Sequence, residues 1–268
     1  MQQKNKPKIG LALGSGGAKG LAHIGIIKVL KENNIPIDFI AGSSIGAMVG
    51  GCYAALGEID EIEKVAIKTD SRRMLSLIDP VFSRGGLVRG EKIKKFFEQF
   101  VNGIDISDCK IPFVSVTTDL KNGETVILKK GKLSEAIQAS IACPPFFKPV
   151  EIESRALCDG GLSMPVPVEV VKKMGADIVI AVNLDGYQPS DIHKAGVVFF
   201  KAAQRTIWLL RHHLSVSNIK NADVVIAPPT GRMYWNKFIR GEKVILAGEE
   251  AARAILPEIE RLIREKTR

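Results

Sequence analysis

The segment that most constrains the fold of this chain is residues 42–46, with the sequence Gly-Ser-Ser-Ile-Gly. An apolar run precedes it and a run of small residues follows, so we expect a strand to turn directly into a helix there. In a Gly-x-Ser-x-Gly turn of this kind, the central serine adopts a strained backbone conformation that directs its hydroxyl outward. The spacing therefore selects Ser44, rather than Ser43, as a candidate nucleophile, and Gly42 and Gly46 leave room for the chain to reverse.

A second glycine-rich segment, residues 14–20, reads Gly-Ser-Gly-Gly-Ala-Lys-Gly and lies between an expected strand and an expected helix. Backbone N–H groups at such a junction point at whatever occupies the loop. A dinucleotide-binding loop would need Gly-x-Gly-x-x-Gly, and a Walker loop would need Gly-Lys-Ser/Thr, so both alternatives are disfavoured but stay open. We favour an oxyanion hole, in which amides around Gly16 and Gly17 stabilise charge on an acyl oxygen and the amide of Ile45 adds a further donor.

A nucleophilic serine also needs a base within hydrogen-bond reach. Three histidines follow Asp159 in the chain and would allow a Ser-Asp-His order; they are His193, His212 and His213. We disfavour this triad because the three lie in an expected long helix, and because too few strands precede Ser44 for that hydrolase fold. His23 is expected to pack or to cap a helix.

Asp159 is the better candidate for the base. It ends a short expected strand and opens a turn formed by Gly160 and Gly161. A carboxylate can accept the serine proton when burial raises its pKa or when the serine is held close and aligned. A dyad of Ser44 and Asp159 is therefore the working hypothesis, and an aspartate that merely forms a turn is the alternative.

Strand-like and helix-like segments alternate along the chain. The expected strands are 9–13, 37–41, 113–117, 125–128, 156–158, 178–183 and 224–227, and the expected helices are 21–33, 45–56, 59–68, 90–101, 134–142, 166–174, 193–216 and 242–264. Because the strands are near-continuous apolar runs, we expect an α/β fold with three layers, α/β/α, around a mostly parallel central sheet. Neighbouring parallel strands would bring the glycine segment and Ser44 to one crevice, and residues 70–89 are expected to cover it.

Composition narrows the class of protein. A hydrophobic content of 46% and a mean hydropathy of +0.09 are typical of a folded globular chain, which we expect to be a single domain over 1–268, with its motifs within 9–162 and C-terminal helices within 190–268. No apolar run is long enough for a transmembrane helix. Four cysteines without a Cys-x-x-Cys pair, and an N-terminus unlike a secretion signal, predict a cytoplasmic protein.

The net charge of +9 indicates an attraction to anionic surfaces. Membranes attract lysine and arginine residues that lie close to their surface. We expect an ordinary solvated basic surface, and peripheral contact with the inner face of the membrane is the alternative. No nucleic-acid motif accompanies the charge, and we expect no nucleic-acid partner. The sequence indicates nothing about oligomeric state.

Three motifs in this order closely resemble the patatin-like phospholipase family: Ser-Gly-Gly-Ala-Lys-Gly, Gly-Ser-Ser-Ile-Gly and Asp-Gly-Gly. The resemblance covers about residues 9–162 and is strongest to bacterial, single-domain members. It implies a Ser-Asp dyad without histidine, with Ser44 as nucleophile and Asp159 as base, that hydrolyses esters of phospholipids, lysophospholipids or neutral lipids without a metal or an organic cofactor. It also implies that Lys19 and Ala18 belong to the oxyanion loop together with the two glycines named above.

The chain departs from the family pattern at two positions. Ser15 replaces the first glycine of the loop triplet, which requires a negative φ at this residue. Pro145 stands where a glycine is usual, in the segment before the aspartate strand. Neither change removes a reacting group, so a lipid acyl hydrolase is the favoured function. The alternatives are an acyltransferase on the same scaffold, a non-catalytic lipid-binding or regulatory protein, and a nucleotide-dependent oxidoreductase.

Overall fold

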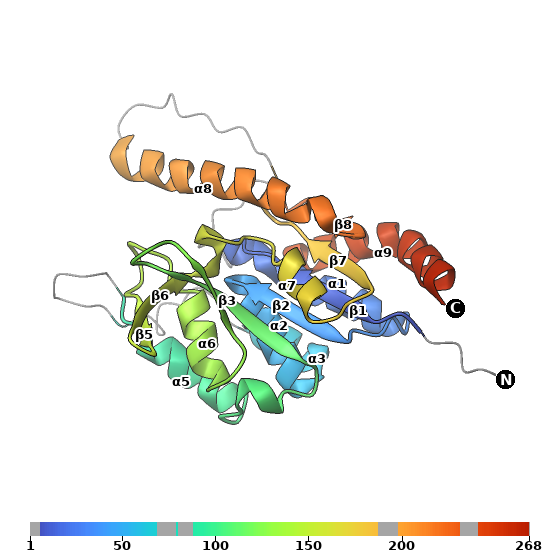
Figure 1. Ribbon diagram of the computed structural model, residues 1–268, viewed down its shortest axis with the longest axis horizontal. Helices are drawn as coiled ribbons and strands as arrows, with labels where there is room; N and C mark the ends of the chain where they lie inside the picture. The colour runs from blue at the N-terminus through green and yellow to red at the C-terminus, as the bar shows by residue number, and fades with distance from the viewer. Residues whose placement is uncertain (1–5, 69–78, 80–87, 187–197, 231–240, 268) are drawn as a thin grey trace.

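The computed structural model describes residues 6–68, 79, 88–186, 198–230 and 241–267 (Figure 1). The cover predicted at residues 70–89 lies outside these residues except at 79, 88 and 89, and His193 lies outside them as well.

A central β-sheet carries the candidate site. Its strands are β1 (Ile9–Leu13), β2 (Phe39–Ser43), β3 (Phe113–Asp119), β4 (Thr125–Leu128), β5 (Val150–Ile152), β6 (Arg155–Asp159), β7 (Ile178–Val182) and β8 (Val224–Ile226). They are ordered β5-β6-β3-β2-β1-β7-β8, and β4 pairs separately with β3. The five strands from β3 to β8 along this order are parallel, whereas β4, β5 and β6 pair antiparallel, so the prediction of a mostly parallel sheet is confirmed.

Helices cover both faces of this sheet. They are α1 (Ala22–Glu32), α2 (Ile45–Leu56), α3 (Ile59–Lys68), α5 (Glu91–Phe100), α6 (Leu133–Ser140), α7 (Val168–Lys173), α8 (Val198–Asn218) and α9 (Gly241–Lys266), with 3-10 turns η1 (Gly17–Leu21), η2 (Ile106–Asp108), η3 (Gly160–Leu162) and η4 (Ile219–Asn221). One apolar core joins the sheet to α1, α2 and α9, and a second, centred on Val171 and Val179, joins its other face to α7. The three-layer α/β/α prediction is therefore confirmed.

Helix α8 lies outside these layers. Figure 1 shows it as a long helix along one side of the molecule, on the side opposite to α5 and α6. None of the helices within the described residues is both long enough and apolar enough to cross a membrane.

Two elements differ from the sequence prediction. The expected strand at 37–41 instead spans Phe39–Ser43, so it runs straight into the elbow. Strand β5 was not predicted, because its three residues are joined to β6 by a two-residue turn, Glu153 and Ser154, with φ values of 50° and 62°. Turns of this kind favour glycine or asparagine, and their absence here left no signal in the sequence.

The sheet register brings the candidate residues together. Leu13 at the end of β1 lies level with Gly42 of β2 and with Val182 of β7, so three parallel strands end side by side. Asp159 at the end of β6 pairs with Thr117 of β3, the next strand along. The carboxyl ends of parallel strands are where α/β proteins form their sites.

Candidate active site

Ser44 occupies the turn between β2 and α2 in a strained conformation. Its φ of 56° and ψ of −123° are rare for a residue that carries a side chain. The turn is tight on both sides: a Cβ at Gly42 would lie 2.4 Å from the carbonyl oxygen of Gly46, and a Cβ at Gly46 would lie 2.1 Å from that of Leu13. Only glycine fits at these two positions, which explains the Gly-x-Ser-x-Gly spacing.

The Ser44 hydroxyl is hydrogen-bonded to the carboxylate of Asp159. Ser44 Oγ donates to Asp159 Oδ2 at 2.7 Å, and the other carboxylate oxygen accepts the N–H of Gly161 at 2.7 Å. Both side chains belong to buried residues, with 7% and 5% of their surface exposed. The geometry is that of a nucleophile beside its base.

The surroundings of Asp159 adjust its proton affinity. Burial raises the pKa of this carboxyl above its ordinary value; the Arg211 guanidinium, the Ser44 hydroxyl and the Gly161 amide oppose the rise, and Asp185 adds to it. A carboxylate with a raised pKa holds a proton more readily, which suits a general base.

Ser140 of α6 holds the backbone of the elbow in place. Its Oγ accepts the Ser44 N–H at 2.9 Å and donates to the carbonyl oxygen of Val116 at 2.6 Å. The Ser44 amide is therefore engaged in holding the turn. Residue 140 carried no signal in the sequence, because a serine in an amphipathic helix has no distinctive neighbours.

The glycine loop, residues 14–20, packs against this elbow. A Cβ at Gly20 would lie 2.1 Å from the side chain of Ile45, so η1 and the start of α2 are in direct contact. Within the described residues, the N–H groups of Gly16 and Gly17 have no hydrogen-bond partner, whereas the Ser15 N–H is bonded to the carbonyl of Pro165. Unpartnered amides beside a nucleophile are what an oxyanion hole requires.

Other residues of the glycine loop have distinct surroundings. Gly17 has a φ of 58°, a value that favours glycine. Ser15 has no positive φ, so its backbone has the conformation that a residue with a side chain requires. The Ala18 side chain is fully buried in the core, so this residue can offer only its backbone. Lys19 is 6% exposed, and burial lowers the pKa of its ammonium, which Asp185 partly offsets.

An ion pair at the edge of the site was not predicted from the sequence. Arg211 of α8 binds Asp185, which follows β7, from Nε to Oδ2 at 3.2 Å and from Nη2 to Oδ1. Ser15 Oγ of the glycine loop donates to the same Oδ2 at 3.2 Å. The position of Asp185 just after a parallel strand was a usable signal, whereas nothing distinguished Arg211 from the other basic residues of its helix.

The described histidines take other roles. His23 is fully buried, and its Nε2 donates to the carbonyl of Gly14 at 2.8 Å, so it holds the start of the glycine loop. Burial lowers the pKa of His23 to about 4. His212 and His213 lie in helix α8, as predicted, and His212 Nδ1 contacts the carbonyl of Asp185. No imidazole within the described residues is hydrogen-bonded to Ser44 or Asp159.

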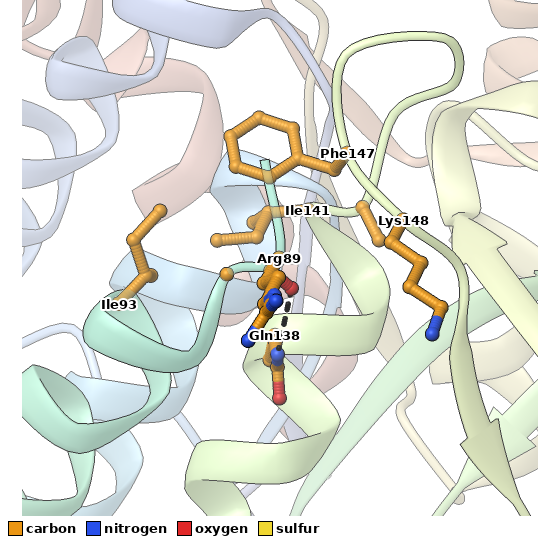
Figure 2. A pocket seen from close by; sticks show the side chains of 8 residues that line it. Arg89, Ile93, Gln138, Ile141, Phe147 and Lys148 are labelled. Carbon is orange, nitrogen blue, oxygen red and sulfur yellow. Dashed lines mark hydrogen bonds between the residues drawn. The ribbon is translucent and has the colours of Figure 1, made fainter. Parts of the chain in front are cut away.

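A small surface depression lies near the aspartate strand (Figure 2). Its lining residues are Arg89, Gly90, Ile93, Gln138, Ile141, Ala142, Phe147 and Lys148. The carbonyl of Ala142 accepts the N–H of Asp159 at 3.1 Å, which joins this depression to the site. Among the described residues, no group of histidines, cysteines and acidic residues could hold a metal ion.

Fold and site together define an α/β protein in which a serine at a nucleophile elbow is hydrogen-bonded to an aspartate. The family model described as patatin-like phospholipase matches residues 11–172. The chain belongs to the patatin-like phospholipase family.

Two relatives agree with this assignment. An uncharacterized NTE family protein of Mycobacterium tuberculosis is 44% identical over 182 residues, which is 68% of this chain and 50% of that protein. The human patatin-like phospholipase domain-containing protein 6 is 28% identical over 194 residues, 70% of this chain and 14% of that protein. The chain thus spans about half the length, or less, of these relatives.

The fold is shared with two solved structures of low sequence identity. VipD from Legionella pneumophila matches with a TM-score of 0.62 and 14% identity over 95% of this chain and 67% of that one. The type III effector protein ExoU matches with a TM-score of 0.52 and 12% identity, over 95% of this chain and 54% of that one.

Proposed function

We propose that this protein is a serine acyl hydrolase that cleaves carboxylic esters of phospholipids, lysophospholipids or related lipids. The observation that carries the proposal is the 2.7 Å hydrogen bond from Ser44 Oγ to Asp159 Oδ2, made at a strained elbow. Lipid esters are favoured because the chain is similar to proteins named patatin-like phospholipases.

In the proposed mechanism, Asp159 accepts the Ser44 proton as Oγ attacks the ester carbonyl. The charge that develops on the acyl oxygen is stabilised by the free amides of the glycine loop, at Gly16 and Gly17, and by the Ile45 amide. Ala18 and Lys19 complete this loop. One such donor is worth about 2.7–4 kcal/mol of barrier.

Three proton transfers complete the cycle. When the tetrahedral intermediate collapses, the proton held by Asp159 passes to the departing alcohol, which leaves an acyl ester on Ser44. Asp159 then removes a proton from water, whose oxygen attacks that ester, and returns the proton to Ser44 Oγ as the acid departs. No step requires a metal ion or an organic cofactor.

Peripheral contact with an anionic membrane surface is part of the same proposal. A net charge of +9 favours such contact, and two leucines on α8, Leu210 and Leu214, are 61% and 36% exposed. The substrate would then be taken from the bilayer surface.

The test combines fluorophosphonate labelling with hydrolysis of a short-chain chromogenic ester. We expect Ser44→Ala to abolish labelling and Asp159→Asn to lower turnover by at least about 10³-fold. Two matched controls are Ser43→Ala, the neighbouring serine, and Asp119→Asn, a buried aspartate on the adjacent strand; both should stay within a few-fold of the wild type.

Different outcomes separate the alternatives. A folded wild-type protein that neither labels nor turns over would refute the hydrolase and leave a non-catalytic lipid-binding role. Labelling with slow hydrolysis, and with product transferred to an added alcohol, would indicate an acyltransferase instead.

A further inference from the structure

The ion pair between Asp185 and Arg211 has no part in the mechanism above. The Asp185 side chain is 2% exposed and that of Arg211 is 17% exposed. Burial of two charges offsets most of their attraction, so a buried pair of this kind is weak evidence of a purely stabilising role. Its position at the end of β7, beside the candidate active site, calls for another explanation.

Packed residues connect this pair to Asp159. Ser15 Oγ donates to Asp185 Oδ2 at 3.2 Å, which ties the glycine loop to the ion pair. A Cβ at Gly161 would lie 2.9 Å from Ser15 Oγ and 3.0 Å from Asp159 Oδ1, so the loop, the turn and the carboxylate are in contact. The Gly161 N–H itself donates to that Oδ1 at 2.7 Å.

Charged and titratable groups face Asp159, or the ion pair beside it, from every element packed there. They are Ser44 of the elbow, Cys143 after α6, Cys158 of β6, Lys19 of η1, Asp185 after β7, and Arg211 and His212 of α8; Asp119 of β3 acts on Cys158. Burial raises the pKa of the Cys143 thiol to about 12 and that of Cys158 to about 11, so both stay neutral near pH 7. The charges that act on the Asp159 carboxylate are therefore those of Arg211, which favours its ionised form, and Asp185, which opposes it.

We propose that Asp185 and Arg211 are positioning residues of the active site: Asp185 holds the glycine loop through Ser15, and its ion pair with Arg211 fixes that guanidinium beside the turn that carries Asp159. The inference rests on the proposed function, in which Asp159 is the base. Helix α8, which lies outside the family motifs, thereby completes the site.

The test is the pH dependence of kcat/KM for the chromogenic ester, measured on the full chain. The acid limb of this profile reports the ionisation of the base in the free enzyme. Arg211→Gln removes the positive charge and should move the acid limb to higher pH by about one unit, so activity below the limb falls about tenfold. Asp185→Asn removes the opposing negative charge and should move the limb to lower pH.

Three further variants separate charge from structure. Arg211→Lys retains the charge and should keep the acid limb near its wild-type position, while the double variant Asp185→Asn/Arg211→Gln should lie between the two single variants. Ser15→Ala removes the tie to the loop without changing charge; it should lower kcat and leave the limb unmoved.

Circular dichroism establishes that each variant is folded. If Arg211→Gln does not fold, Asp185→Asn and Arg211→Lys still carry the test. Acid limbs that move in the same direction for Arg211→Gln and Asp185→Asn, or that do not move in either, would overturn the inference. A wild-type protein without esterase activity would instead refute the proposed function, so the two failures are distinct.

Discussion

The strained backbone at Ser44 yields a prediction about stability that is independent of activity. Ser44 has a φ of 56° and a ψ of −123°, a conformation that glycine adopts freely but that costs other residues about 1–3 kcal/mol. Glycine also loses more backbone entropy on folding than alanine, by about 0.5–1 kcal/mol. The difference leaves Ser44→Gly more stable than Ser44→Ala by up to about 2.5 kcal/mol.

Both variants lack the hydroxyl, so the lost bond to Asp159 cancels between them. Ser43, one residue earlier in β2, provides the matched control because it is fully buried and its φ is not positive. There Ser43→Gly should be less stable than Ser43→Ala by about 0.5–1 kcal/mol. The order of stability of glycine and alanine therefore reverses between adjacent positions.

The assay is urea unfolding followed by circular dichroism, with the free energy of unfolding extrapolated to water. Thermal unfolding gives a second measure, because 1 kcal/mol shifts the midpoint by about 2–4 °C in a domain near this size. If alanine is the more stable residue at both positions, the elbow stores no strain and the reasoning is refuted.

Two further predictions concern residues that support the site. The pKa of His23 falls from 6.5 to about 4 on folding, so unfolding is accompanied by proton uptake between these values. The free energy of unfolding should fall by up to about 3 kcal/mol as the pH drops from 6.5 to 4, and His23→Gln should remove this dependence, as urea midpoints at pH 7 and pH 5 would reveal. Ser140→Ala leaves the buried Ser44 N–H without its acceptor and should cost about 1–3 kcal/mol along with activity. Ser134→Ala, in the same helix, removes a buried hydroxyl that has no partner among the described residues and should cost less than about 0.5 kcal/mol; equal losses at the two serines would contradict this account.

Much of the fold could be predicted because its signals are local. The apolar runs that form β1, β3 and β7 are near-continuous, as strands covered on both faces require, and their positions match the prediction closely. Strand β5 could not be predicted, because only its pairing with β6 makes three residues a strand. The structure likewise extended β2 to Ser43, where its pairing with β3 continues to the edge of the elbow.

The sequence by itself determined which residues are chemically suited to the site. The spacing of Gly42, Ser44 and Gly46 follows from the volume of a Cβ in a tight turn, and Asp159 was singled out by the Gly-Gly turn after it. These are constraints between near neighbours in the chain, and one sequence suffices to express them.

Only the tertiary structure decided what surrounds those residues. Ser140 lies 96 residues from Ser44 along the chain, and Arg211 lies 26 residues from Asp185, yet each pair is hydrogen-bonded. Such partners depend on which strand ends and helices the sheet order brings together, and the side chains themselves are ordinary serines, arginines and aspartates. The candidate reacting groups were therefore fixed by local backbone geometry, whereas the charges and hydrogen bonds that position them arise from packing across the whole sheet.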